Sequence, residues 1–424
     1  MVAVSLKKKL HEREVQNSIQ NKKTTKTKEK TNSARARSPA RSALFAEAAL
    51  SWRTLAARLS AAAWYDVVYN RPTSNTTLTS NHSPASEFPD DTRQVMGRDA
   101  EVLDAFVYGR FDLGGQALSA RLGRHTLLWG ESLFFGSNGI AGGQAPLDLV
   151  KLLSVPNAQF KEVARPIGKL SGTLQLSDAV TLGAYIGYEW EKTRLMPSGA
   201  YLSSSDALGP GAERINAGPT GTFLRQPDLE AKDTGQGGVQ LRWNVAAIET
   251  DIGFYAIRYH ATGPSNNWTT LSGFPPALKA DSYRWVYHEG ITAFGASFAK
   301  SVDEWSLAGE VSYRWDTPLA SSGQAIIPAI GVGVAFDNND NPGYAVGETA
   351  HAQFSWLASL GPVSYTHLRA HETVLDLVCR LLLEKKKKKH RNDEIHYDTR
   401  SRKITTLLYD TAVHRHYARH ARRH

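Results

Sequence analysis

The chain has 424 residues and a formal net charge of +9, and its single cysteine is Cys379. The basic charge lies at the two ends: residues 1–42 carry 12 basic and 3 acidic side chains, and residues 362–424 carry 15 and 7. Residues 43–361 carry 23 basic and 31 acidic side chains, so the middle is acidic and gives no reason to expect nucleic acid as a partner. With no cysteine there, disulfides, thiolate zinc sites and cysteine nucleophiles are excluded from the middle.

The first segment, residues 1–42, is rich in lysine and poor in aromatic and branched apolar side chains. It buries too little apolar surface to offset the entropy lost on ordering, so we predict a disordered segment. It has neither an RNA-binding motif nor interleaved aromatic residues, which disfavours a nucleic-acid arm or a transit-like segment. We interpret it as a non-native start.

The middle region, residues 43–361, contains no run of 18 apolar residues, so no transmembrane helix is expected. Apolar and polar side chains instead alternate with period two, which predicts strands with one apolar face. The alternation is clear in residues 118–122, 180–190, 239–245, 250–256 and 307–315. Strands of about nine to eleven residues are long enough to cross a bilayer when tilted by about 45°.

Two all-β architectures fit this alternation. A soluble β-sandwich has a buried and a wetted face, whereas a membrane barrel has a lipid face and a lumen face. Tryptophans near predicted strand ends favour the barrel, because aromatic girdles flank its lipid band. We assign to this girdle Trp64, Trp129, Trp190, Trp243, Trp285, Trp315 and Trp356. The predicted fold class is all-β: an antiparallel transmembrane β-barrel that is partial and open or incompletely closed.

Long polar segments separate the predicted strands at 71–94, 196–235, 262–282 and 316–347. Short turns such as Ser177–Asp178 alternate with them. This asymmetry is typical of outer-membrane barrels, which have short periplasmic turns and long external loops.

Polar residues on the predicted strands are candidates for the lumen. An arginine facing lipid at mid-bilayer costs about 2–4 kcal/mol, so Arg121, which shares a strand face with His125, is predicted to face the lumen. There it either selects solutes within a charged constriction or stiffens the wall through an ion pair. The lumen or constriction candidates are Arg121, His125, Glu131, Glu189, Arg242, Asp251, Glu310 and Arg314.

The glycine-rich segment 136–143 lacks the Gly-Lys-Ser/Thr ending of a phosphate loop, so a turn or an inward-folded constriction is the stronger interpretation. The next segment, with Leu149, Leu152 and Leu153 at helical spacing, fits a lumen plug or a connecting turn.

Catalytic and metal sites find little support in the sequence. Ser132, His125 and Asp148 have the residue types of a triad, but no nucleophile elbow accompanies them. The histidines lack the spacing of metal ligands, and Glu189 and Glu191 need no catalytic explanation as lumen acids. We expect no enzyme activity, no metal and no cofactor.

Residues 362–389 resemble the translated sequence of a transposase adapter used in DNA library preparation. Ser364–Glu372 match one block of that adapter, and Leu377–Glu384 with the following lysines match its far end. We therefore expect residues 362–424 to be a non-native tail.

A resemblance to a known family rests on the middle region. The segment 103–153 contains Arg121, Gly123, Arg124 and His125, followed by Trp129-Gly130-Glu131-Ser132. Further matches follow in order at 161–168, 188–206, 233–243, 253–264, 287–298 and 307–319. Over nearly all of residues 43–361 the chain resembles the bacterial outer-membrane family known as domain of unknown function 1302.

The resemblance implies a large barrel in the outer membrane of a Gram-negative bacterium. It also implies a periplasmic partner, a pump of the resistance-nodulation-division type, and a role as conduit for small hydrophobic or aromatic molecules. The family pattern further includes a signal peptide and closing terminal strands, and we expect both to be missing from this chain. Two alternatives stay open: a non-transporting scaffold or binding barrel with the same partners, and a soluble β-sandwich binding module.

Overall fold

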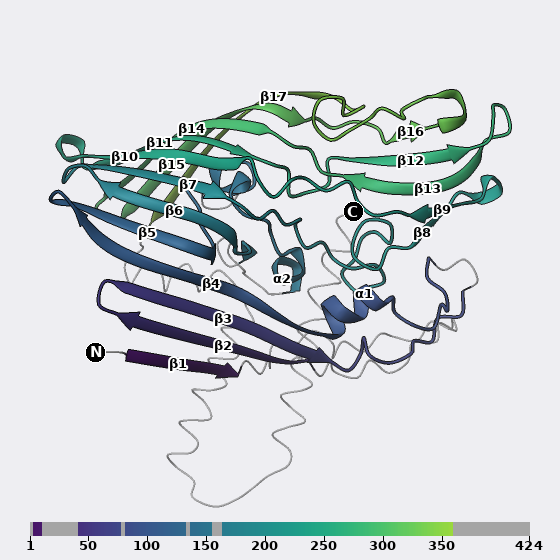
Figure 1. The fold of residues 1–424 in the computed structure, drawn as a ribbon, viewed down its shortest axis with the longest axis horizontal. Helices are drawn as coiled ribbons and strands as arrows, with labels where there is room; N and C mark the ends of the chain where they lie inside the picture. The colour runs from purple at the N-terminus through teal and green to yellow at the C-terminus, as the bar shows by residue number, and fades with distance from the viewer. Residues whose placement is uncertain (1–2, 11–40, 78–80, 133–135, 155–162, 359–424) are drawn as a thin grey trace, which may run out of the picture. The chain divides into compact units, whose positions relative to one another are not determined.

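The computed structural model describes residues 3–10, 41–77, 81–132, 136–154 and 163–358. These residues form two β-sheets, and short helical segments lie in some of the connections between strands (Figure 1). The predicted all-β class is therefore confirmed. The predicted tail, residues 362–424, lies outside the described residues.

The larger sheet is antiparallel and has 12 strands, which pair almost entirely in chain order. Its strands are β1 (Ala3–Leu10), β2 (Arg41–Trp52), β3 (Leu55–Asp66), β4 (Arg98–Leu113), β5 (Gln116–His125), β6 (Ile167–Gln175), β7 (Val180–Gly187), β10 (Gln236–Val245), β11 (Thr250–Tyr259), β14 (Ile291–Val302), β15 (Trp305–Pro318) and β17 (Val346–Ala358). β1 and β17 are the two ends of this order, so across the described residues the sheet is open.

The strand β1 departs from the sequence-based expectation. We predicted disorder for all of residues 1–42, whereas Ala3–Leu10 pair with β2 over residues 44–51. A strand edge presents unpaired backbone groups that any extended segment can satisfy, whatever its side chains. The rest of that segment, residues 11–40, lies outside the described residues, and β2 begins at Arg41.

Connections of two very different lengths join the strands of the larger sheet. Short turns follow β2, β4, β6, β10 and β14, at residues 53–54, 114–115, 176–179, 246–249 and 303–304. Gly114 and Gly115 have φ of 66° and 88°, the left-handed values that a two-residue hairpin turn of type I′ requires. Long connections follow β3, β5, β7, β11 and β15, so they all leave from the opposite strand ends.

The second sheet is built from three of these long connections, those that follow β7, β11 and β15. It has five strands in the order β16-β12-β13-β9-β8. Their bounds are β8 (Arg214–Asn216), β9 (Thr222–Arg225), β12 (Asn266–Ser272), β13 (Lys279–Val286) and β16 (Gln324–Ile326). The short helices are α1 (Asp90–Thr92), η2 (Arg93–Gly97), η3 (Ile140–Gly143), α2 (Leu149–Ser154), η4 (Gly218–Thr220), η5 (Ala246–Ile248) and η6 (Pro328–Ile330).

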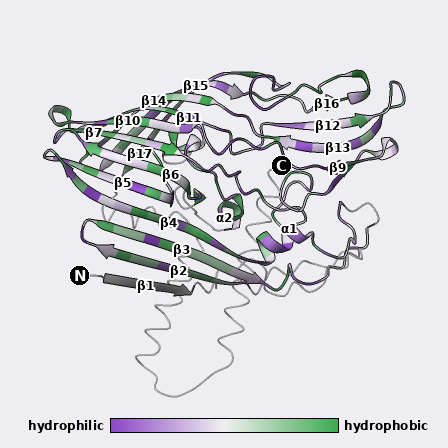
Figure 2. Cartoon of the chain, viewed as in Figure 1, coloured by the Kyte–Doolittle hydropathy of each residue, from purple (hydrophilic) through white to green (hydrophobic). Residues whose placement is uncertain are grey.

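The larger sheet has one exposed apolar face, which we call the outer face. Strand alternation is visible as hydrophobic and hydrophilic residues in turn along the strands (Figure 2). In β7, Leu182 and Ile186 are exposed whereas Gly183, Tyr185 and Gly187 are buried. The register aligns one outer-face row across seven strands: Leu118, Leu174, Leu182, Leu241, Phe254, Ala296 and Val311. The alternation predicted from the sequence thus sets which side chains share a face.

The opposite face, here the inner face, carries most of the buried groups of this sheet. Its main apolar cluster consists of Trp129, Ile140, Tyr185, Tyr255, Ile257, Tyr259, Ile291 and Ala293. Two smaller clusters lie among the long connections, around Met96 and around Trp268. Among the described residues, every helix is too short or too polar to cross a bilayer.

Candidate functional site

The connection between β5 and β6 lies against the inner face of strands that come much later in the chain. We call residues 126–132 and 136–148 the inward segment. Its main anchor is Glu310 on β15, whose side chain is almost completely buried. Glu310 Oε2 accepts a hydrogen bond from Glu131 N at 2.8 Å, and Oε1 accepts one from Ile140 N at 2.6 Å. A single carboxylate thus holds both halves of the segment.

Two glycines make this close approach feasible. A Cβ atom at Gly130 would lie 2.2 Å from Glu310 Oε2, and one at Gly139 would lie 2.6 Å from Oε1. Gly130 also has φ of 91°, a conformation that other residues adopt only with strain. A side chain at either position would therefore displace the Glu310 carboxylate from its hydrogen bonds to the segment.

Further polar contacts fix the segment to β15, β10 and β17. Arg314 Nη2 donates to the carbonyl oxygens of Ser137 and Gly139 at 2.9 and 3.0 Å. Ser312 Oγ donates to Asn138 O at 3.2 Å. The remaining pairs are Ser132 Oγ with Gln353 Oε1 at 2.9 Å and Arg242 Nη2 with Glu131 Oε1 at 3.5 Å.

Aromatic packing supports the same arrangement. Trp129 contacts Tyr185 edge-on with ring centroids 5.1 Å apart, and it stacks near Tyr255 at 6.4 Å. Ile140 belongs to the same buried cluster. The inward segment therefore has an apolar anchor in addition to its hydrogen bonds.

A buried lysine lies beneath the inward segment. Lys169 on β6 is 1% exposed, and its Nζ donates to Gln144 O at 2.8 Å. The same ammonium group lies 5.6 Å from the ring centroid of Tyr185. Gln144 Oε1 in turn accepts from Trp129 N at 2.5 Å. A carbonyl and an aromatic ring thus stabilise a cation that burial would otherwise disfavour.

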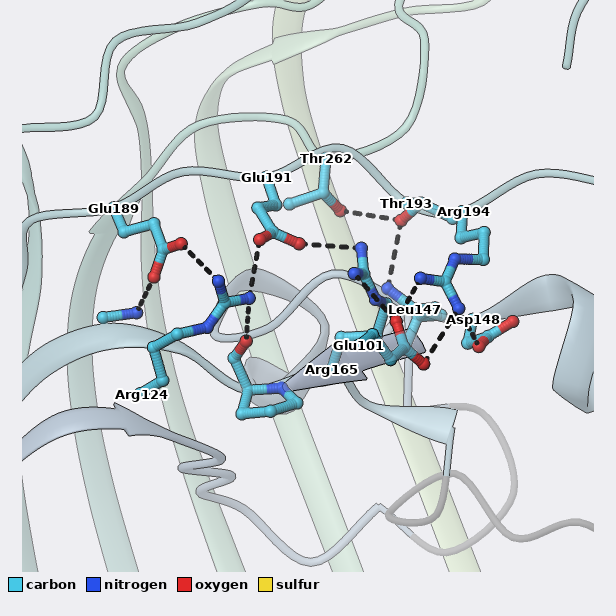
Figure 3. Close-up of polar contacts among 12 residues, drawn as sticks. Glu101, Arg124, Leu147, Asp148, Arg165, Glu189, Glu191, Thr193, Arg194 and Thr262 are labelled. Atoms are coloured by element: carbon cyan, nitrogen blue, oxygen red, sulfur yellow. Dashed lines mark hydrogen bonds and ion pairs between the residues drawn. The ribbon is translucent and has the colours of Figure 1, made fainter. Parts of the chain in front are cut away.

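A chain of alternating charges runs past the inward segment (Figure 3). Arg124 pairs with Glu189 at 2.9 Å and with Glu191 at 2.6 Å. Arg165 joins Glu191 at 2.7 Å to Glu101 at 3.7 Å. Arg194 completes the chain by contacting Glu101 and by pairing with Asp148 at 3.1 Å. Glu189 Oε2 also accepts from Gly168 N at 2.5 Å.

This charge network is partly shielded from water, so the loss of one of its ion pairs destabilises the fold more than the loss of a surface ion pair. Its side chains are 14–30% exposed. Burial lowers the pKa of the Arg194 guanidinium, but Glu101 and Asp148 more than offset this, so the net shift is upward. Removing one partner of such a pair leaves an uncompensated charge, which is strongly destabilising. The network therefore ties residues that precede β6 and follow β7 to β4.

The structure brings together four of the eight predicted lumen residues. Glu131, Arg242, Glu310 and Arg314 all contact the inward segment or belong to it. The other four have their partners outside it: Glu189 in the charge network, Asp251 beside Asn244, His125 buried against Ser171, and Arg121 over the ring of Phe106. Arg121 pairs in register with buried Ser171, and alternates with the exposed outer-face residue Leu122.

Two of the tryptophans assigned to the girdle are buried in the structure. Trp129 and Trp190 are only 6% and 7% exposed, because the connections that carry them lie against other parts of the chain. Trp190 packs edge-on against Tyr287. Trp285 belongs to the second sheet, and Trp64 donates its Nε1–H to Val95 O. Trp243, Trp315 and Trp356 are exposed side chains of the larger sheet, as are Trp52 and Trp305.

Several residues of the site were not predicted from the sequence. Gln144, Lys169, Ser312 and Gln353 give no local signal, because their partners are between 15 and 221 positions away in the chain. The three residues with triad side chains have separate partners: Ser132 contacts Gln353, His125 contacts Ser171, and Asp148 contacts Arg194.

These features define a class: an all-β protein whose large antiparallel sheet exposes an apolar face and holds a connection against its polar face. The chain belongs to the family described as protein of unknown function DUF1302, which matches residues 25–406. The match includes the region that carries the resemblance, 43–361, and extends into both flanking segments. No curated protein matches the chain.

Proposed function

We propose that this chain forms the wall and the inward constriction of an outer-membrane β-barrel that conducts small apolar or aromatic molecules across the cell envelope. One observation carries the proposal: the larger sheet pairs an exposed apolar face with a polar face against which a connection is anchored. The apolar face suits lipid, and the polar face suits a lumen.

The exposed face is difficult to reconcile with water. The row from Leu118 to Val311 crosses seven strands, and neighbouring rows add Ile186, Val239 and Phe294. Soluble monomers rarely expose a contiguous apolar patch of more than about 300–600 Å². In a membrane, lipid covers this face, so no second sheet is needed to cover it.

The exposed tryptophans fit the dimensions of a bilayer. Trp305 and Trp315 stand near opposite ends of β15, ten residues apart. At about 3.3 Å per residue this is about 33 Å along the strand. With a tilt of about 45°, the separation along the membrane normal is about 23 Å, close to the apolar band of about 25 Å in such barrels. Trp356 stacks on Trp305 at 5.1 Å and strengthens one girdle.

The short turns and long connections support an orientation. In outer-membrane barrels the short turns face the periplasm and the long loops face outward. We therefore propose that the turns at residues 114–115 and 303–304 are periplasmic, on the side of the periplasmic partner and pump that the family resemblance implies.

The test is made with the full chain refolded into detergent and then into a planar lipid bilayer. We expect heat-modifiable migration on gels and discrete steps of ion current. Failure to insert would overturn the membrane assignment. Insertion without current, together with capture of a periplasmic partner, would overturn the conduit and favour the scaffold role.

A further inference from the structure

An arginine and two aromatic residues share a neighbourhood on the inner face of β4 and β5. The register pairs Tyr108 with Arg121 and Phe106 with Gly123, while Val107 pairs with the outer-face residue Leu122. Phe106 and Tyr108 therefore project to the same side as Arg121. The rings of Phe106 and Tyr108 are 5.8 Å apart, and Arg121 Cζ lies 6.0 Å from the Phe106 centroid. Arg121 and Tyr108 are both exposed.

Arg121 differs from two other inner-face arginines, Arg58 and Arg242, because it has no carboxylate partner in the described part of the chain. Arg58 pairs with Glu47 and Asp104, and Arg242 pairs with Glu131. Arg314 is held by two carbonyl oxygens. Arg121, by contrast, has no carboxylate partner anywhere in the described part of the chain; its one specific contact is with a ring.

A second cation lies close to this group. Arg110 follows Tyr108 by two positions on β4, so it projects to the same side, and its register partner is Ser119, two positions before Arg121. Arg110 is exposed, and it too forms no ion pair within the described ranges. Two uncompensated guanidinium groups beside two aromatic rings are complementary to an anion that carries a ring.

We propose that Phe106, Tyr108, Arg110 and Arg121 form a binding site for aromatic carboxylates on the wall of the conduit. The planar guanidinium of Arg121 presents paired N–H donors that match a carboxylate, and hydrogen bonds between ionised partners are the strong ones. The ring of the ligand packs beside Phe106 and Tyr108, where offset and edge-on contacts are favourable. The inference rests on the proposed conduit and names its substrate class.

The test measures block of the potassium chloride current through the full chain in a planar bilayer at neutral pH. Three probes separate the two recognition elements: sodium benzoate has ring and charge, sodium acetate has only the charge, and benzamide has only the ring. We expect benzoate to block at a concentration at least about tenfold lower than either of the others, as a charge-assisted hydrogen bond provides. Equal block by benzoate and benzamide would overturn the role of Arg121.

Variants identify the residues. Arg121→Gln should raise the half-blocking concentration of benzoate about tenfold or more and leave that of benzamide unchanged. Arg121→Lys keeps the charge without the paired donors, so its half-blocking concentration of benzoate should lie between those of the wild type and of Arg121→Gln. Arg93→Gln, which removes an arginine paired with Glu87 and Asp90 in the connection after β3, is the control and should leave the benzoate block unchanged. Heat-modifiable migration of each variant verifies folding.

The outcomes also separate this inference from the proposed function. A wild-type chain that inserts but carries no current overturns both. If benzoate blocks the current through the Arg121→Gln variant as strongly as it blocks the wild-type current, only the aromatic carboxylate site is overturned.

Discussion

Replacing Glu310 by alanine should release the inward segment while leaving the strands of the larger sheet paired. The carboxylate is the acceptor for Glu131 N and Ile140 N, at 2.8 and 2.6 Å. Alanine removes both acceptors, and the neighbours of position 310 on β15, Gly309 and Val311, lie on the opposite face of the strand. The two N–H groups then recover partners only if the segment moves toward water.

The expected magnitude follows from these two hydrogen bonds. A hydrogen bond to a charged group contributes about 1.5–3 kcal/mol to stability. At the lower estimate, two such bonds contribute about 3 kcal/mol. The free energy of opening the segment should fall by this amount in the variant. Since 1.36 kcal/mol corresponds to a factor of ten, opening should become about 100-fold more frequent.

Hydrogen–deuterium exchange of the full chain in detergent measures this opening directly. Peptides covering residues 136–144 should exchange about 100-fold faster in Glu310→Ala, whereas peptides covering β10 (239–245) should keep the wild-type rate. Asp251→Ala is the matched control, because the Asp251 carboxylate lies on β11 and accepts its hydrogen bond from Asn244 Nδ2 rather than from the inward segment. Exchange of residues 136–144 within about threefold of wild type would refute the assigned anchoring role of Glu310.

Three further outcomes are expected. Leu241→Arg on the outer face should destabilise the bilayer-inserted protein by about 2–4 kcal/mol in urea unfolding, whereas Gln240→Arg on the inner face should have a smaller effect; equal effects would contradict the lipid-facing assignment. Gly139→Ala places a Cβ 2.6 Å from the Glu310 carboxylate and should speed exchange of the inward segment, whereas Gly263→Ala, which meets nothing within 4 Å, should not. Burial lowers the pKa of His288 from its ordinary value of 6.5. An unfolded chain takes up a proton near pH 6.5 and the folded imidazole does not, so stability should be constant above that pH and decline below it. His288→Asn should weaken this decline in urea unfolding followed by tryptophan fluorescence, and an unchanged pH profile would count against it.

The sequence determined the strands and the sidedness of the larger sheet. Period two is a local property: once residues 180–187 are extended, Leu182 and Ile186 must share a face, and Tyr185 must lie on the other. The contrast between short turns and long connections is also local, because it depends only on how many residues separate consecutive strands. These features could be read without knowing which strands are neighbours.

The tryptophans mark the limit of that local information. Trp243 and Trp129 look alike in the sequence, since each is near a predicted strand end. Trp243 lies on a strand, where alternation fixes its side, and it is exposed. Trp129 lies in a connection, and only the path of that connection decided that it packs against Tyr185.

The tertiary structure alone decided the site. Glu131 and Glu310 are 179 positions apart. They are in contact because the connection that follows β5 lies against the inner face of β15, where Glu310 is located. The same holds for Arg124, whose partners Glu189 and Glu191 lie beyond two further strands. Alternation assigns a side chain to a face, but the pairing of distant side chains depends on the order and register of all the strands between them. That order is a property of the assembled sheet, in which each strand satisfies the backbone hydrogen bonds of its neighbours.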